Sequence, residues 1–237
     1  MQKQMEELRQ SEKDIAPVLK LIALLQERCA GNASVSAEII SLVLSTWKEC
    51  LSDKSLRPCI WDGDISKNAQ YIDIRHTVYG DHERKMIFSI EDVKRLIETG
   101  VLRAHREKLS EIVHILHCAN ASHRRIESKN LSLSDNDPYP PTAIFLPADS
   151  YTLELIDGNH RADLAKRSGT DLSIFVVDNF VMPPQAFLGL QSWATYNILS
   201  GVYYLQLPEF VRRLGGPYTT QFAAMLQEYR TWVQKYQ

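Results

Sequence analysis

The sequence predicts a mixed α/β (α+β) protein, and three observations lead to this fold class. Apolar residues recur at helical spacing over the first 55 positions. Strand-like and helical patterns then follow one another between Trp61 and Phe180. Within that region, the stretch from Tyr151 to Gly169 combines a strand, a tight turn and a short helix closed by glycine. We therefore expect an α/β core with helical additions at both ends of the chain.

Residues 1–58 are expected to form a helical hairpin that packs on the core as an annex or lid. The apolar residues of its first helix are Val18, Leu21, Ile22, Leu25 and Cys29. Those of its second helix are Ile40, Val43, Leu44, Trp47 and Leu51. Gly31 and Asn32 separate the two helices, because this pair favours a turn.

Residues 59–182 are expected to form the core domain. A short strand is predicted over Tyr71 to Ile74. A helix then starts at the capping-box sequence Ser89 to Asp92 and ends at Gly100. A second helix is predicted from the spacing of Leu109, Ile112, Val113 and Leu116. The order strand, helix, strand implies a right-handed crossover.

Residues 183–237 are expected to form a C-terminal helical region that begins at Pro183 and Pro184. The last helix carries one apolar and strongly aromatic face, formed by Phe222, Met225, Leu226, Tyr229, Trp232, Val233 and Tyr236. This face is expected to belong to the core. The alternative is contact with a partner chain, which would make the protein an oligomer.

Composition excludes several classes of protein. The 237 residues carry a formal net charge of −2 and a sequence pI near 6.4, so bulk nucleic acid is a disfavoured partner. No apolar run approaches a membrane span, and the first residues lack the apolar centre of a signal peptide. The expected compartment is the cytoplasm, although secretion as an effector by a signal-less route stays open.

Neither the cysteines nor the histidines that cluster near Cys118 are expected to bind a metal. The four cysteines are widely spaced without a C-x-x-C pair, which favours reduced packing cysteines over disulfides. The histidines at 105, 114, 117 and 123 cluster near Cys118, a superficial likeness to a zinc site. Because no zinc-binding motif accompanies them and arginines are interleaved, a solvated surface is the preferred interpretation.

The chemistry is expected at the turn between the strand and the helix, which consists of Asp157, Gly158, Asn159, His160 and Arg161. Backbone N–H groups at the start of a helix lack partners and attract phosphate, particularly where a glycine lets the ligand approach. Arg161 adds a cationic fork, and Asp157 adds a carboxylate for a metal or a hydroxyl proton. The structural alternative is that Asp157 only caps the helix and that Arg161 pairs with Glu154 or Asp163.

The stretch from Pro140 to Asp178 resembles the phosphate-binding core of the ParB/sulfiredoxin superfamily, which implies a small mixed sheet. In this resemblance Pro141 to Leu146 is the entering strand, and Tyr151 to Ile156 is the next. Asp157 to Arg161 is then the D-G-x-x-R signature, and Leu172 to Asp178 is the closing strand. The D-G-x-H-R form is closest to the free serine kinases, which phosphorylate a small hydroxyl substrate with a nucleotide.

The resemblance implies roles for individual residues. Asp157 matches the motif carboxylate, with catalytic and magnesium-binding roles, and His160 is a further catalytic candidate. Gly158, Asn159, His160 and Arg161 match the positions that hold phosphate. Glu83, beside His82, matches the catalytic glutamate of the kinases more loosely, and a solvated loop is the alternative there.

The expected function is transfer of phosphate from a nucleoside di- or triphosphate (ATP, ADP or CTP), with Mg²⁺, to a small hydroxyl acceptor. Two alternatives stay open. The same turn with a metal suits a ParB-like nuclease or an NTP-hydrolysing toxin. A nucleotide-gated binding protein without fast turnover is the alternative from another class.

Overall fold

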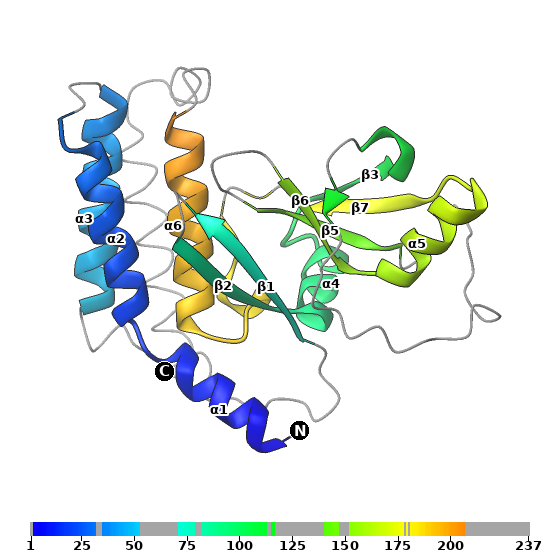
Figure 1. The fold of residues 1–237 in the computed structure, drawn as a ribbon, viewed down its shortest axis with the longest axis horizontal. Helices are drawn as coiled ribbons and strands as arrows, with labels where there is room; N and C mark the ends of the chain where they lie inside the picture. Colours follow the sequence, from blue (N-terminus) through cyan, green and yellow to red (C-terminus); the bar gives the residue numbers. More distant parts are fainter. Residues whose placement is uncertain are drawn as a thin grey trace. The chain divides into compact units, whose positions relative to one another are not determined.

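The computed structural model confirms the mixed α/β class, with helices and two small sheets. It describes residues 2–31, 35–52, 71–78, 82–112, 115–116, 140–146, 152–177, 179 and 181–206. The chain divides into two compact units (Figure 1). Unit 1 contains residues 1–69 and 180–237, and unit 2 contains residues 70–179. The described residues within 2–52 and 181–206 therefore belong to one unit.

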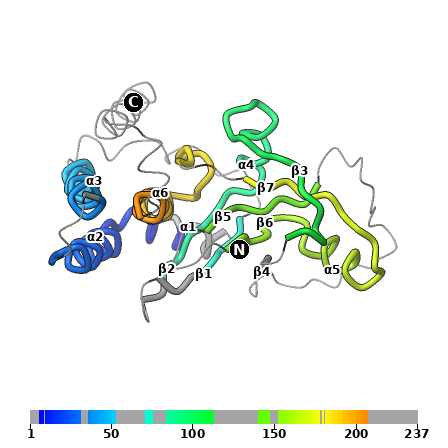
Figure 2. Tube along the Cα trace, turned by 90° about the horizontal axis from the view of Figure 1, so that it is seen from above, coloured from blue at the N-terminus to red at the C-terminus, as the bar shows by residue number. Residues whose placement is uncertain are grey.

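Unit 1 is helical. Its elements are α1 (Gln2–Glu12), α2 (Ala16–Cys29), α3 (Val35–Ser52), the 3-10 turn η5 (Pro184–Ala186) and α6 (Leu190–Gln206). Helices α2, α3 and α6 lie side by side, as both ribbon views show (Figures 1 and 2). The two helices predicted from apolar spacing are present as α2 and α3. Pro183 and Pro184 start the 3-10 turn, and α6 follows it.

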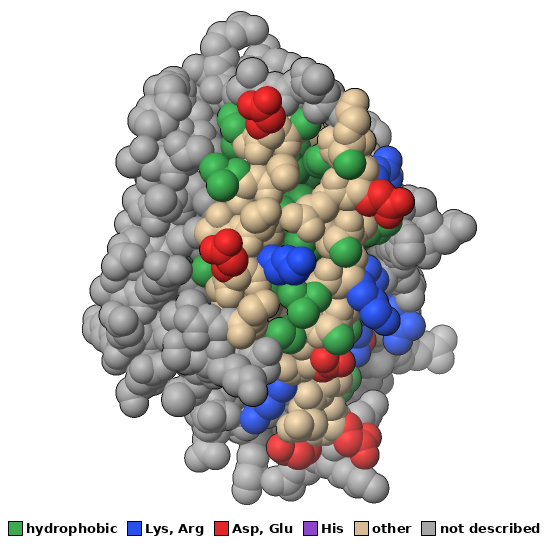
Figure 3. All heavy atoms as spheres, turned by 90° about the vertical axis from the view of Figure 1, so that its left-hand side faces the viewer, with side chains coloured by type: hydrophobic (Ala, Val, Ile, Leu, Met, Phe, Trp, Pro, Cys, Tyr) green, Lys and Arg blue, Asp and Glu red, His purple; other side chains and the backbone are tan. Residues whose placement is uncertain are grey.

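The core of unit 1 is built around α6. Thirteen of the 17 residues of α6 are buried, whereas α2 and α3 bury one face each and expose the other. Among the described residues on the face that Figure 3 draws, charged side chains are scattered among hydrophobic and neutral polar ones. Trp47 of α3 meets Trp193 of α6 edge to face, with ring centroids 5.1 Å apart. Such pairs stabilise beyond the area that they bury.

Buried polar groups in α6 are bonded to the segment that precedes the helix. The side chain of Asn197 accepts a hydrogen bond from Met182 N (2.9 Å) and donates to Met182 O (3.1 Å). It also donates to Trp193 O (2.9 Å). The carboxylate of Glu12 accepts from Ser192 N (2.8 Å) in the first turn of α6. These bonds offset the cost of burying polar atoms and fix the entry of the chain into α6.

Unit 2 contains both sheets. Strands β1 (Tyr71–Val78) and β2 (His82–Ser89) form an antiparallel hairpin that leads directly into α4 (Ile90–Glu98). The second sheet has five strands in the order β3-β7-β5-β6-β4. Its elements are β3 (Ala104–Lys108), the 3-10 turn η3 (Leu109–Glu111), β4 (Ile115–Leu116), β5 (Thr142–Leu146), β6 (Thr152–Asp157), α5 (Asn159–Ser168) and β7 (Ser173–Val177).

The five-stranded sheet is mixed. Strand β5 pairs antiparallel with β6 and parallel with β7, and all five of its residues are buried. Strands β6 and β7, which α5 connects, therefore run in opposite directions on either side of β5. The expected right-handed crossover is wrong for this connection, because that rule concerns parallel strands.

The helix predicted from Leu109 to Leu116 is also wrong. The chain instead forms β3 before Leu109, a single 3-10 turn at Leu109–Glu111, and the two-residue strand β4. Strand β3 pairs with β7 and β4 pairs with β6, so long-range pairing overrides the helical spacing of the apolar residues.

Other predictions of local structure are confirmed or lie outside the described residues. The helix after Ser89 is present as α4, but the Ser89 hydroxyl donates to Asp92 Oδ2 (2.5 Å) and does not cap the backbone. The aromatic helix at 222–236 lies outside the described residues. None of the helices within the described ranges combines the length and the apolar character needed to cross a bilayer.

Candidate functional site

The turn between β6 and α5 requires a glycine. Gly158 has a left-handed backbone conformation (φ 80°), which residues with a Cβ rarely adopt. A Cβ at this position would lie 2.5 Å from Cβ and 2.8 Å from Cα of Pro141, which precedes β5. The backbone of the turn is thus in close contact with the neighbouring strand, which fixes where α5 begins.

Helix α5 begins at Asn159, inside the stretch that the sequence predicted as a turn, so His160 and Arg161 lie in its first turn. The first intrahelical bond runs from Ala162 N to Gly158 O (3.0 Å). No side chain caps the helix at Gly158, so the alternative that Asp157 serves as its cap is not supported. At its other end, α5 stops at Gly169, as predicted (φ 66°).

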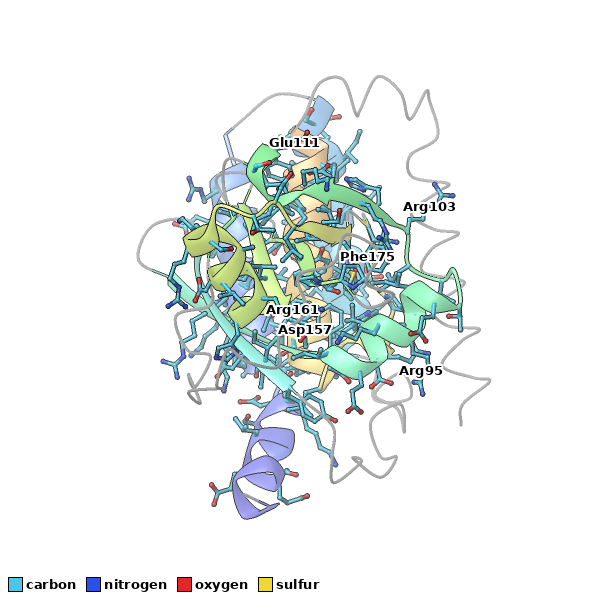
Figure 4. The ribbon with its side chains drawn as sticks, turned by 90° about the vertical axis from the view of Figure 1, so that its right-hand side faces the viewer. Arg95, Arg103, Glu111, Asp157, Arg161 and Phe175 are labelled. Carbon is cyan, nitrogen blue, oxygen red and sulfur yellow. The ribbon has the colours of Figure 1, made fainter. Side chains whose placement is uncertain are left out.

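Asp157 lies between two cationic side chains. Its Oδ2 atom is 2.5 Å from Lys94 Nζ and 3.6 Å from a terminal nitrogen of Arg161. All three side chains are partly buried, with exposed fractions of 20% for Asp157, 31% for Lys94 and 17% for Arg161. Figure 4 shows Asp157 and Arg161 beside each other at the start of α5. One carboxylate and two cations leave this cluster with a formal charge of +1.

The ion pairs of Asp157 depend on proximity more than on directed hydrogen bonds. Oδ2 is buried, and no donor meets it in hydrogen-bond geometry even though Lys94 Nζ is at ion-pair distance. An ammonium group rotates freely about its last bond, so Lys94 can turn an N–H toward this oxygen at the observed distance. The ammonium group of Lys94 can therefore donate N–H bonds to an additional anionic partner.

Lys94 is the residue of this site that the sequence did not indicate. It belongs to α4, 63 positions before Asp157, where it precedes the exposed Arg95. A lysine on the polar side of an amphipathic helix normally extends into solvent. Only the tertiary arrangement of unit 2 brings Lys94 to Asp157.

The remaining residues of the turn are half-buried. Asn159 donates from Nδ2 to Leu155 O (3.4 Å), and its Oδ1 atom is buried with no hydrogen-bond donor. His160 is half-buried in the first turn of α5. The structure therefore brings together all five residues predicted for the turn and adds Lys94.

The structure does not describe the side chain of the other predicted catalytic residue. Glu83 lies on β2, where its backbone is paired with that of Thr77. Its side chain and that of His82 lie outside the described residues. The role of Glu83 stays a prediction.

The histidine cluster is only partly described. His105 lies on β3 with its Nε2 atom 2.6 Å from a carboxylate oxygen of Glu107, and both side chains are exposed. Positions 114, 117, 118 and 123 lie outside the described residues. Among the residues that the structure does describe, no three His, Cys, Asp or Glu side chains come together as metal ligands.

Comparisons with known proteins do not assign this site: no family model, no curated protein and no solved structure matches the chain.

The arrangement suits phosphate better than a metal bound by protein atoms alone. Phosphate oxygens are recognised by cationic side chains and by the backbone N–H groups at the start of a helix. This site offers Lys94, Arg161 and the start of α5, and Gly158 has no side chain that would block the approach. Asp157 could offer one carboxylate to Mg²⁺, but Lys94 already lies against its Oδ2. Mg²⁺ usually combines one or two carboxylates with phosphate oxygens and water, so it fits here only together with a bound nucleotide.

Proposed function

We propose that the chain binds the phosphates of a nucleoside di- or triphosphate at the β6–α5 turn and transfers phosphate to a small hydroxyl acceptor. The observation that carries the proposal is the pairing of Lys94 and Arg161 around Asp157 at the uncapped start of α5. The resemblance of this turn to the D-G-x-H-R form of the ParB/sulfiredoxin superfamily suggests the reaction class.

Binding would use the cations and the backbone. Arg161 offers a planar fork that matches two phosphate oxygens, and Lys94 offers a compact charge. The backbone N–H groups after Gly158 add donors without a side chain in the way, because Pro141 leaves no space for one. Asp157 would act as a positioning residue that holds both cations in place before the nucleotide arrives.

Transfer would then require an acceptor hydroxyl near the terminal phosphate. The new bond joins the acceptor oxygen to phosphorus, the bond to the leaving nucleotide breaks, and the hydroxyl proton moves to a carboxylate. Glu83 is the proposed base, with Asp157 as the other carboxylate of the proposed site. When Mg²⁺ is bound with the nucleotide, it neutralises charge on the phosphates.

The proposal is tested first by ligand stabilisation and product analysis. The full-length chain is heated with ATP, ADP, CTP or inorganic triphosphate, with and without Mg²⁺, because a ligand that binds the folded state raises its Tm. Samples with a stabilising nucleotide are then offered small hydroxyl compounds, RNA and DNA. A phosphorylated small molecule supports the proposal. Cleaved nucleic acid or free phosphate favours the hydrolase alternative, and binding without product favours the nucleotide-gated binder.

Two amide variants separate binding from chemistry. Asp157→Asn and Glu83→Gln keep the shape of the side chain but lose its charge and its capacity to take a proton. If either carboxylate acts in the reaction, its variant should bind nucleotide while turnover falls about 100-fold or more. A Glu83→Gln protein with wild-type turnover would remove Glu83 from the proposed mechanism.

A further inference from the structure

A row of four residues crosses the five-stranded sheet at the end that carries the turn. The strand register pairs Arg106 of β3 with Phe175 of β7, Phe175 with Thr142 of β5, and Thr142 with Asp157 of β6. Neighbouring strands lie about 4.8 Å apart, so Phe175 is roughly 10 Å from Asp157 along this row. In Figure 4 Phe175 lies between the labelled Arg103 and Arg161.

Phe175 is also joined to the turn through one intermediate residue. Its backbone N–H donates to Pro141 O (2.8 Å), and Pro141 is the residue in close contact with Gly158. This connection holds the position of the Phe175 backbone relative to the start of α5. A ligand with its phosphates at that start would therefore meet Phe175 at a fixed separation.

Phe175 differs from its neighbours in β7. The four other residues of the strand are buried, whereas Phe175 is only partly covered. The guanidinium carbon of the exposed Arg106 lies over its ring, 5.2 Å from the centroid. An aromatic ring and a guanidinium plane are the two groups on which proteins stack nucleic-acid bases.

We propose that Phe175 and Arg106 form the base-binding platform of the nucleotide whose phosphates bind at the β6–α5 turn. The base stacks on the ring of Phe175, and Arg106 moves outward to cover the other face of the base. Two stacked layers need about 7–8 Å between the outer planes, from carbon contacts of 3.5–4.0 Å. The exposed arginine must therefore shift by roughly 2–3 Å from its present position. Stacking tolerates any base, so this platform predicts affinity for nucleotides with little preference between ATP and CTP.

The inference rests on the proposed phosphate site, and calorimetry with two kinds of ligand separates them. Inorganic triphosphate reports on the phosphate site alone, whereas ATP and CTP report on the phosphate site and the platform together. For the wild-type chain we expect both nucleotides to bind more tightly than inorganic triphosphate. Phe175→Leu should weaken ATP and CTP by about five- to 150-fold, the range expected for loss of base stacking, and leave inorganic triphosphate unchanged.

Three further variants make the test specific. Phe175→Trp keeps an aromatic surface and should retain nucleotide affinity. Arg106→Gln removes the guanidinium and should weaken ATP while leaving inorganic triphosphate unchanged. Arg103→Gln is the matched control, because this exposed arginine lies just before β3 and engages Asn179 through its backbone N–H. It should bind ATP like the wild type.

The outcomes distinguish the two proposals. A folded Phe175→Leu protein that binds ATP as tightly as the wild type overturns the platform and leaves the phosphate site standing. If Phe175→Leu lowers the affinities for ATP and for inorganic triphosphate equally, the platform is also overturned, because the substitution then disturbs the turn through Pro141. If inorganic triphosphate does not bind the wild type but Phe175→Leu still weakens ATP, the platform stands and the phosphate site fails. If no nucleotide binds, both fail.

Discussion

Replacing Gly158 with alanine should destabilise the protein more than the same change at Gly169, the glycine at the other end of α5. Two costs add at this position. A residue with a Cβ in the left-handed region costs about 1–2 kcal/mol. The added Cβ would also lie 2.5 Å from the Pro141 Cβ, and overpacking of this kind costs about 1–3 kcal/mol. The free energy of unfolding should therefore fall by roughly 2–5 kcal/mol.

Gly169 at the other end of α5 provides the matched control. It has the same left-handed conformation (φ 66°), but a Cβ there would meet no atom within 4 Å. Gly169→Ala should therefore cost only about 1–2 kcal/mol. Alanine restricts the unfolded chain equally at both sites, so this effect cancels when the two variants are compared. The difference between them, about 1–3 kcal/mol, measures the contact with Pro141.

The assay is urea unfolding of the wild type and both variants, followed by circular dichroism and tryptophan fluorescence. If Gly158→Ala and Gly169→Ala lower the free energy of unfolding equally, the claim that the turn lies in close contact with Pro141 is refuted. Pro141→Gly should not fully rescue Gly158→Ala, because the Pro141 Cα would still lie 2.8 Å from the new Cβ.

Three other predictions follow from single contacts. Lys94→Met should weaken inorganic triphosphate by about tenfold or more in calorimetry, since one charge-assisted bond contributes roughly 1.5–3 kcal/mol. Lys85→Met, which breaks the comparable pair with Asp73 (3.0 Å), should leave that affinity unchanged, and equal losses would contradict the role of Lys94. Asn197→Ala should lower the free energy of unfolding by about 1–3 kcal/mol, because it removes the acceptor of the buried Met182 N–H, whereas Met182 O keeps its bond from Trp193 Nε1; an unchanged free energy would contradict this. Burial raises the pKa of the Cys29 thiol, partly opposed by Arg28. Stability relative to Cys29→Ser should therefore be constant below about pH 8 and fall as the pH rises above it, whereas a rise would contradict the shift.

The sequence predicted the elements around the site because β6 and α5 are marked by residues within or next to each element. Alternating residues mark β6, and glycines mark both ends of α5, where each is in the left-handed conformation that only glycine adopts readily. The predicted bounds differ from the observed ones by a residue or two, since an uncapped helix start gives no cap residue to mark it.

The features that the sequence did not predict depend on long-range packing. Lys94 of α4 pairs with Asp157 at the end of β6, and the spacing of residues in α4 does not indicate this contact. The opposite directions of β6 and β7 follow from the insertion of β5 between them. The apolar spacing from Leu109 to Leu116 fits a helix, but pairing of β3 and β4 with opposite edges of the sheet stabilises strands there.

The most direct test of the phosphate site is a calorimetric titration of inorganic triphosphate and ATP into Arg161→Ala and Arg167→Ala. Both variants remove one arginine from α5, but Arg161 lies in the first turn beside Asp157 and Arg167 lies in the last turn. We expect Arg161→Ala to bind both ligands about ten- to 150-fold more weakly, as loss of charge-assisted hydrogen bonds implies, and Arg167→Ala to bind like the wild type. Wild-type affinity in a folded Arg161→Ala protein, or equal loss in both variants, would contradict the account.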